Sequence, residues 1–291
     1  MHLLYSWYTT QTFSVKWGNV VSSAFTVRNG TRQGGILSPV LFNVYIDELS
    51  VKLQNTDSGC YINNACLNHL IYADDTVLIA PSATALQQLL NICQDFVKEN
   101  DLELNPKKSK YMVIKTDIIK GLQCPDVYIN ATLITRVSNV KYLGVHICDD
   151  LSDDMAIANC VQGTYTRGNL IKRNFSCCTQ DVKQKLFQSY CSSFYCCSLW
   201  HHFKKESYRK LKVSYNNVFR IVCGGISRGD SISQYFASLN IPHCDVLRRK
   251  LVLGMYKRVK SCTNYLINTL VDSTFFFNSR LFKSWRTILY I

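Results

Sequence analysis

Apolar residues in the first part of the chain recur at the spacing of amphipathic helices in two places. One helix is expected to begin at Ser38 and Pro39, because serine is a favoured N-cap and proline a favoured first helical residue. A second helix is predicted over residues 82–99. The apolar face of the first is formed by Phe42, Ile46, Leu49 and Leu53, and that of the second by Leu86, Leu89, Leu90, Cys93, Phe96 and Val97.

Short apolar runs around and after these helices predict strands. Two such runs flank Asp74 and Asp75 within residues 70–80, and this pattern predicts a hairpin of two buried strands with both carboxylates at its tip. Three further strands are predicted over residues 111–115, 127–137 and 141–147. The first half of the chain is therefore expected to be α+β, with an antiparallel sheet and helices in layers.

The pattern changes near residue 150. An acidic, polar stretch over residues 149–154 makes a plausible boundary, and the segments after it are mostly helical. The clearest helices are expected over residues 184–200 and 210–222, with Gly224 and Gly225 ending the second. We therefore expect two regions, one over residues 1–150 and a helical one over residues 151–291.

Charge is distributed unevenly between these two regions. The net charge of +13 comes from 12 Lys and Arg against 13 Asp and Glu in residues 1–150, and from 21 against 7 in residues 151–291. The second region, at a net +14, is expected to bind a polyanion in a salt-dependent manner. Tyrosines interleaved with the cations, such as Tyr208, Tyr215 and Tyr256, favour nucleic acid, and ordinary basic helix faces are the alternative.

The adjacent carboxylates of Asp74 and Asp75 are the strongest candidate chemistry. Two neighbouring negative charges repel one another, so such a pair is favoured where a divalent cation neutralises it, and oxygen ligands favour Mg²⁺ or Mn²⁺. A solvated acidic turn is the alternative. Upstream, Gly34 and Gly35 precede a helix N-terminus, where a backbone can approach a phosphate or a base closely.

Four segments together resemble the reverse transcriptase domain. Residues 32–39 (Arg-Gln-Gly-Gly-Ile-Leu-Ser-Pro) and 72–75 (Tyr-Ala-Asp-Asp) look most like retrotransposons that lack long terminal repeats. Residues 102–110 resemble the family's lysine-bearing segment, and residues 140–145 resemble the hairpin that grips the primer. The resemblance implies a right-hand polymerase, with partial fingers and palm over residues 1–150 and a helical thumb and C-terminal extension over residues 151–291.

The resemblance also implies residue roles in two-metal nucleotidyl transfer. Asp74 would bridge two Mg²⁺ or Mn²⁺ ions, Asp75 would support the metal site, and Lys108 would protonate the leaving pyrophosphate, with a solvated lysine as the alternative. The implied substrates are an RNA template, a DNA primer and deoxynucleoside triphosphates. The nucleotide- or template-binding positions would be Arg32, Gln33, Gly34, Tyr72 and Ala73, and the primer grip would be Tyr142, Leu143 and Gly144.

One departure from the family pattern changes the expected activity. The family supplies a third metal-binding carboxylate ahead of the glycine-rich loop, whereas the first acidic residue here is Asp47. We therefore expect the C-terminal part of a reverse transcriptase, inactive or nearly so by itself. The alternatives are a nucleic-acid-binding protein without chemistry, derived from a retroelement, and a decayed remnant with no stable fold.

The 14 cysteines invite a disulfide or zinc interpretation, and neither is favoured. The N-terminus lacks the pattern of a signal peptide, and the cysteines and histidines lack zinc-site spacing, so free thiols are expected. No apolar run is long enough to span a membrane. We therefore do not expect a membrane among the partners of this chain. The expected location is intracellular, nuclear or cytoplasmic.

Overall fold

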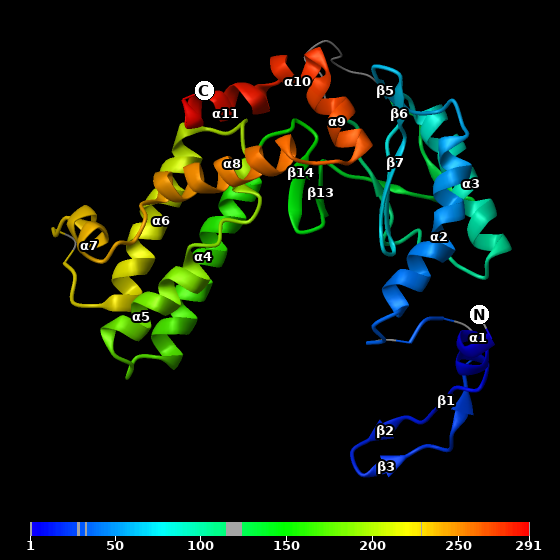
Figure 1. Ribbon diagram of the computed structural model, residues 1–291, viewed down its shortest axis with the longest axis horizontal. Helices are drawn as coiled ribbons and strands as arrows, with labels where there is room; N and C mark the ends of the chain where they lie inside the picture. The colour runs from blue at the N-terminus through cyan, green and yellow to red at the C-terminus, as the bar shows by residue number, and fades with distance from the viewer. Residues whose placement is uncertain (1, 28–29, 33, 115–123, 228, 291) are drawn as a thin grey trace.

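The chain forms an arch of helices and small hairpins (Figure 1). The computed structural model describes residues 2–27, 30–32, 34–114, 124–227 and 229–290. One side of the arch holds α2 and α3 with the hairpins β5–β6 and β7–β8, and the other holds α4 to α8. Helices α9 to α11 lie at the top, and β13–β14 hangs in the middle. Helices and strands are thus both present, as expected for an α+β chain.

The two helices predicted in the first region are confirmed. Helix α2 (Ser38–Gln54) and helix α3 (Ala83–Glu99) bury most of the predicted apolar residues against each other, while Leu86 and Leu90 of α3 pack on the core around Tyr111 and Ile129. Ser82 caps α3 by accepting a hydrogen bond from the backbone N–H of Ala85. Their shared core consists of Leu49, Leu53, Leu89, Cys93, Phe96 and Val97.

All strands in the described part of the chain pair two by two. The strands before α3 are β1 (Thr12–Phe13), β2 (Lys16–Trp17), β3 (Val20–Val21), β4 (Phe25–Thr26), β5 (Cys60–Ile62), β6 (Ala65–Leu67), β7 (His69–Tyr72) and β8 (Asp75–Leu78). Those after it are β9 (Lys110–Tyr111), β10 (Tyr128–Ile129), β11 (Thr132–Leu133), β12 (Thr135–Arg136), β13 (Asn139–Tyr142) and β14 (Val145–Cys148). Every pair is antiparallel except β9 with β12. The layered sheet that the sequence suggests is therefore replaced by separate two-stranded units.

Two of the predicted strands are wrong because each contains a tight turn. Residues 127–137 break at Asn130 and Ala131, which both have positive φ, and form the short strands β10, β11 and β12. Residues 141–147 break at Leu143 and Gly144, which turn β13 back onto β14. For residues 111–115, only β9 forms at the start of the range, and Lys115 lies outside the described residues.

The second region is helical, as predicted, and its core lies between α4 and α6. Helix α4 (Asp154–Asn174) packs along α6 (Lys205–Cys223), and α5 (Gln180–Leu186), α7 (Ile232–Ser238) and α8 (Cys244–Lys260) surround this pair. Gly224, with φ of +66°, ends α6 as expected. The aromatic side chains of this core with no exposed surface are Phe187, Tyr215, Phe219 and Phe236.

The helix predicted over residues 184–200 is right only as far as Cys191, and residues 192–200 do not continue it. Helix α5 ends at Leu186, a π-turn follows over Phe187–Cys191, and a 3₁₀ turn spans Cys197–Leu199. The apolar residues are buried at intervals of three or four, which imitates a helical period although the backbone between them is irregular. They are Phe187, Cys191, Phe194, Cys197 and Trp200.

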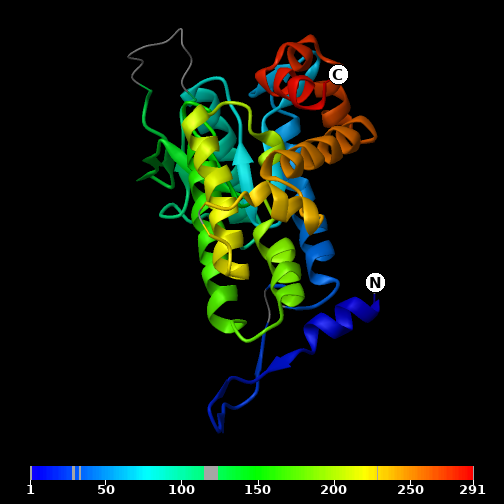
Figure 2. The same ribbon diagram turned by 90° about the vertical axis from the view of Figure 1, so that its left-hand side faces the viewer.

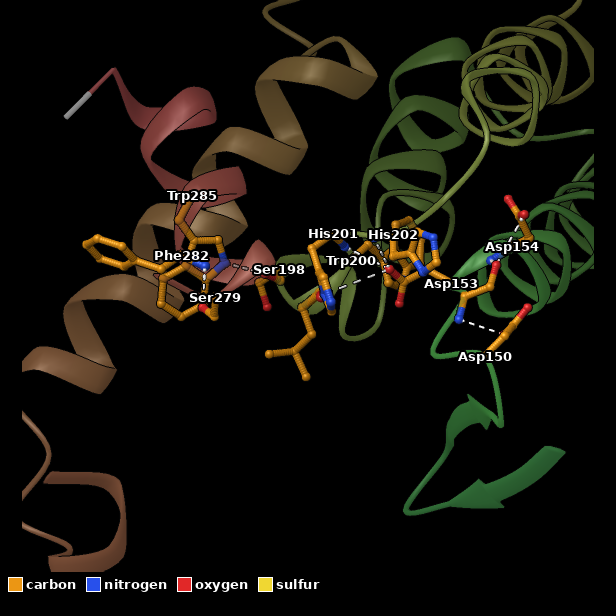
Figure 3. Close-up of polar contacts among 12 residues, drawn as sticks. Asp150, Asp153, Asp154, Ser198, Trp200, His201, His202, Ser279, Phe282 and Trp285 are labelled. Carbon is orange, nitrogen blue, oxygen red and sulfur yellow. Dashed lines mark hydrogen bonds and ion pairs between the residues drawn. The ribbon is translucent and has the colours of Figure 1, made fainter. Parts of the chain in front are cut away.

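The last three helices form a separate small core around a tryptophan. Helices α9 (Tyr265–Asp272), α10 (Thr274–Asn278) and α11 (Arg280–Leu289) pack on α8. Trp285 is only 1 % exposed, and its indole Nε1–H donates to the Ser198 carbonyl at 2.7 Å (Figure 3). The C-terminal core is thereby fastened to the 3₁₀ turn of the preceding unit.

An aspartate at the start of α4 joins that helix to the segment before α6. The Asp153 carboxylate accepts hydrogen bonds from the backbone N–H groups of His201 and His202, each at 2.7 Å (Figure 3). The Asp153 N–H in turn donates to the His202 carbonyl at 2.7 Å. These bonds fix residues 201–202 beside the chain that leaves β14.

The N-terminal segment lies apart from the remainder in both views (Figures 1 and 2). It consists of α1 (His2–Thr9) and the strands β1 to β4, and none of its described residues is buried. Trp17 in its hairpin is 87 % exposed. Across the described residues of the whole chain, no helix has the length and hydropathy needed to cross a membrane.

Candidate functional site

The paired aspartates lie at the tip of a two-residue hairpin, as the sequence predicts. Tyr72 and Asp75 are opposite one another in β7 and β8, so Ala73 and Asp74 form the turn between them. Ala73 has φ of +52°, which a two-residue hairpin turn requires at one or both central positions. The Asp74 and Asp75 side chains are both exposed. Two carboxylates are thus presented to solvent within two residues of chain.

The strands of this hairpin are half-buried, and the prediction of fully buried strands is wrong. Ile71 and Leu78 pack against the α2–α3 core, whereas Leu70 is 41 % exposed and Tyr72 is also exposed. The hairpin pairs with no further strand among the described residues, so only one of its faces is covered.

A buried polar network positions the base of the hairpin, and its residues carry no recognisable sequence signal. The Asn68 amide nitrogen donates to the carbonyls of Leu53 at 2.7 Å and Ser58 at 3.1 Å. The His69 ring bonds through one nitrogen to Asn68 at 2.7 Å and through the other to Ser50 on α2 at 2.8 Å. Burial lowers the pKa of His69, which favours its neutral form. The network ties β7 to α2.

The second hairpin, β13–β14, brings the predicted primer-grip residues to its own tip. Leu143 and Gly144, with φ of +46° and +82°, form the turn between Tyr142 and Val145. Positive φ is unfavourable for leucine, so this turn needs support from elsewhere. The support is Tyr195, whose hydroxyl donates to the Leu143 carbonyl at 2.9 Å. A Cβ on Gly144 would lie 3.1 Å from the Tyr195 ring, so the glycine also allows this close approach.

The tips of the two hairpins lie near enough for charges on one to act on side chains of the other. Burial raises the pKa of Tyr142, and the negative charge of Asp75 raises it further. The adjacent Cys196 raises the pKa of Tyr195, with a smaller contribution from Tyr72. Tyr142 of the second hairpin and Tyr195 of the segment after α5 are therefore within electrostatic reach of the first hairpin. Tyr195 carried no recognisable sequence signal.

The glycine-rich loop folds tightly onto the start of α2, and its serine acts differently from the prediction. Leu37, not Ser38, is the N-cap, and the Ser38 hydroxyl donates back to the Arg32 carbonyl at 2.6 Å. A Cβ on Gly35 would lie 2.6 Å from that hydroxyl oxygen, so any other residue would displace the Ser38 hydroxyl from its hydrogen bond. Gly34, with φ of +79°, is exposed, and Gln33 lies outside the described residues.

Arg32 and Lys108 are both exposed, and neither bonds to the aspartates. Arg32 lines a hollow of about 460 Å³ between α1 and the loop, together with Tyr8, Phe13 and Thr31. Lys108 lies in a turn in which its N–H donates to the Asn105 side chain at 3.1 Å. No hydrogen bond or ion pair between described residues joins the Lys108 side chain to Asp74 or Asp75.

The donor set at the hairpin tip suits a hard divalent cation only in part. Asp74 and Asp75 offer carboxylate oxygens, which Mg²⁺ and Mn²⁺ prefer, but these ions take about six ligands. Within the described ranges, no group of three or more His, Cys, Asp or Glu side chains is arranged to hold a metal ion. Water, substrate phosphate or a further carboxylate would have to complete the site. All fourteen cysteines are free thiols.

The hydrogen bond of the Tyr195 hydroxyl should stabilise the second hairpin locally. We expect Tyr195→Phe to speed amide hydrogen exchange over residues 139–148 by about fivefold, because about 1 kcal/mol of hydrogen bonding is lost at a turn that leucine disfavours. The control is Tyr190→Phe, since Tyr190 is exposed and its hydroxyl makes no hydrogen bond within the described chain. Equal exchange in both variants would show that Tyr195 does not support the turn.

Comparison with known proteins assigns the part of the chain that carries this site to a family. The family described as "Reverse transcriptase (RNA-dependent DNA polymerase)" matches residues 2–147, which is about half of the 291 residues. Both hairpin tips and the glycine-rich loop lie within the match. The chain belongs to the reverse transcriptase family.

Its relatives are proteins of retrotransposons without long terminal repeats, as the sequence resemblance indicates. The chain is 33% identical over 131 residues to the "Retrovirus-related Pol polyprotein from type-2 retrotransposable element R2DM" of Drosophila melanogaster, covering 43% of this chain and 12% of the relative. It is 29% identical over 136 residues to the Pol polyprotein of the type-1 element R2 of Popillia japonica, covering 44% and 22%.

A third relative belongs to a different mobile element. The "RNA-directed DNA polymerase from mobile element jockey" of Drosophila melanogaster is 24% identical over 163 residues, covering 54% of this chain and 17% of the relative. The chain therefore spans less than a quarter of the length of each of these three relatives.

Proposed function

We propose that this chain forms part of the nucleotidyl-transfer site of an RNA-directed DNA polymerase. The observation that carries the proposal is the exposed pair Asp74 and Asp75 at a hairpin tip, with a second hairpin, whose turn holds Leu143 and Gly144, near enough for the Asp75 charge to act on Tyr142. The family match supports this reading, because it covers both hairpins. Residues 1–150 would serve as partial fingers and palm, and residues 151–291 as thumb and extension.

In this proposal each side chain has a distinct task. Asp74 and Asp75 would hold Mg²⁺ or Mn²⁺, and the bound ions would polarise the primer hydroxyl and neutralise charge on the leaving pyrophosphate. Tyr72 and Ala73 would border the primer terminus because they adjoin the carboxylates in the hairpin. The turn at Leu143 and Gly144, together with Tyr142, would position the primer strand.

The remaining predicted residues would act on the nucleotide and the template. Gln33 and Gly34 would line the pocket for the templating base, and Arg32 would contribute a cation beside it. Lys108 would donate a proton to pyrophosphate once substrate brings it near the hairpin tip. The substrates would be an RNA template, a DNA primer and deoxynucleoside triphosphates, held in part by the basic second region at net +14.

Manganese binding tests the proposal directly. With an RNA–DNA primer–template and a deoxynucleoside triphosphate present, we expect Asp74→Asn to weaken Mn²⁺ binding at least about tenfold, because a charged oxygen ligand becomes a neutral one. Asp47→Asn is the matched control, since Asp47 is an exposed carboxylate on α2. Unchanged Mn²⁺ affinity in Asp74→Asn would overturn the metal role.

Primer extension separates the metal role from activity. We expect this chain alone to extend a primer at or near background, because no third acidic, His or Cys side chain of the described residues joins Asp74 and Asp75, and two carboxylates hold two ions poorly. Robust extension that requires Asp74 would refute this inactivity and retain the metal role. A second candidate is nucleic-acid binding without chemistry, favoured by the basic second region. It predicts salt-sensitive binding and unchanged Mn²⁺ affinity in Asp74→Asn.

A further inference from the structure

Helices α8 and α11 form a basic surface outside the part of the chain that matches the family. Residues 244–291 contain nine Lys and Arg against two Asp and Glu, a net of +7. The two helices pack together through Val252, Trp285 and Leu289, so their exposed faces belong to one unit. The exposed cations are Arg249, Lys250, Lys257, Arg258 and Lys260 on α8, and Arg280, Lys283 and Arg286 on α11.

Exposed aromatic rings lie beside cations at both ends of this unit. The Arg249 guanidinium is 4.7 Å from the ring centroid of Tyr290, which is 81 % exposed. The Lys260 ammonium is 5.9 Å from the ring centroid of Phe277, which is 46 % exposed. A surface ring next to a cation offers one face for stacking while the cation is available to a phosphate. Buried rings of this core, such as Trp285, cannot do this.

The two cation–aromatic pairs are spaced along one side of α8. Arg249 and Lys260 are eleven residues apart, which at 3.6 residues per turn leaves them about 20° apart around the helix and about 16 Å apart along it. A single strand running along this side of α8 could therefore meet both pairs. The bases of a single strand can stack on exposed rings, whereas those of a duplex are already stacked and paired.

We propose that the surface of α8 and α11 between Tyr290 and Phe277 binds single-stranded RNA. The two rings would each stack on a base, and the cations would contact the phosphates between those bases. The choice of RNA over DNA rests on the proposed function, in which the template is RNA. The surface is distinct from the aspartate tip, because it lies beyond residues 2–147 and on other helices.

Fluorescence anisotropy with the whole chain tests this proposal. The probes are an unstructured RNA of about 12 nucleotides, DNA of the same sequence, and the RNA–DNA hybrid duplex. We expect Tyr290→Ala to weaken RNA binding about tenfold through lost stacking. We expect Arg249→Gln to reduce the slope of log affinity against log salt by about 0.7. The controls are Tyr265→Ala, since Tyr265 is 69 % exposed on α9 with no cation over its ring among the described residues, and Lys98→Gln on α3.

The outcomes separate this proposal from the polymerase function. Weaker RNA binding in both test variants, with both controls unchanged, supports the surface. Tighter binding of the hybrid or of DNA than of RNA, or an equal loss in Tyr265→Ala, overturns it. A failed Mn²⁺ test of Asp74→Asn would remove the polymerase function and leave this result standing, because the RNA measurement uses other residues and no metal ion. Unchanged RNA affinity in Tyr290→Ala would reject the RNA-binding role of this surface and leave the polymerase function untouched.

Discussion

Trp285→Ala should lower the free energy of unfolding of the C-terminal helices by about 3–5 kcal/mol, as expected for removing a fully buried aromatic side chain. The ring fills the centre of the small core with Val252, Val271 and Phe276 around it. Its Nε1–H also donates to the Ser198 carbonyl at 2.7 Å, so the substitution leaves both a cavity and an unpaired carbonyl. Urea denaturation followed by circular dichroism measures the loss.

Two further variants divide this effect into packing and hydrogen bonding. Trp285→Phe keeps most of the ring volume and loses the indole donor, so we expect a smaller loss of about 1–2 kcal/mol. Trp17→Ala removes a ring that is 87 % exposed and should change the unfolding free energy by no more than about 0.5 kcal/mol. A loss in Trp285→Ala no larger than in Trp17→Ala would mean that this core does not stabilise the chain.

The regular helices could be predicted because the spacing of their apolar residues and their capping residues indicate the same helix. Helix α3 has apolar residues at helical spacing and a serine at its N-cap, and both features appear in the structure. The continuous helix predicted over residues 184–200 did not form, and the reason is physical. Burial of Phe187, Cys191 and Trp200 requires only that they face one core, and an irregular backbone meets that requirement as well as a helix does.

The strands were harder to predict because turns interrupt apolar runs without a strong signal. Asn130–Ala131 and Leu143–Gly144 include alanine and leucine at positive φ, which propensity alone disfavours. Tertiary contacts make the second of these turns possible, because Tyr195 bonds to Leu143 from the region after α5. Such support is visible only in the folded chain.

In the candidate site, too, some features could be predicted from the sequence and others could not. The aspartate tip and the glycine-rich loop were predictable, because adjacent carboxylates between apolar runs and glycines before a helix have few structural solutions. Asn68, His69 and Tyr195 were not, since each acts through a partner distant in sequence. Predicting that Ser38 caps its helix was reasonable and wrong, because the loop carbonyl of Arg32 competes for the hydroxyl.

Asp153→Ala should lower the free energy of unfolding by about 2–4 kcal/mol. The carboxylate accepts two backbone hydrogen bonds, from His201 and His202, each at 2.7 Å, and bonds to a charged acceptor are among the stronger ones. Alanine leaves both donors without their acceptor at a junction between β14, α4 and the segment before α6. Urea denaturation measures the global loss, and hydrogen exchange over residues 199–204 measures the local one.

The matched variants identify the acceptor as the cause. Asp153→Asn retains an oxygen acceptor without the charge and should lose about 1 kcal/mol. Asp150→Ala removes an exposed carboxylate that accepts only from the Ser152 N–H among described residues and should lose less than about 1 kcal/mol. Asp153 lies five residues after β14 ends, and the segment it fixes leads back to Tyr195. Loosening this junction should therefore also speed exchange over residues 139–148, and an unchanged rate there would show that the Leu143 turn is held by Tyr195 independently of Asp153.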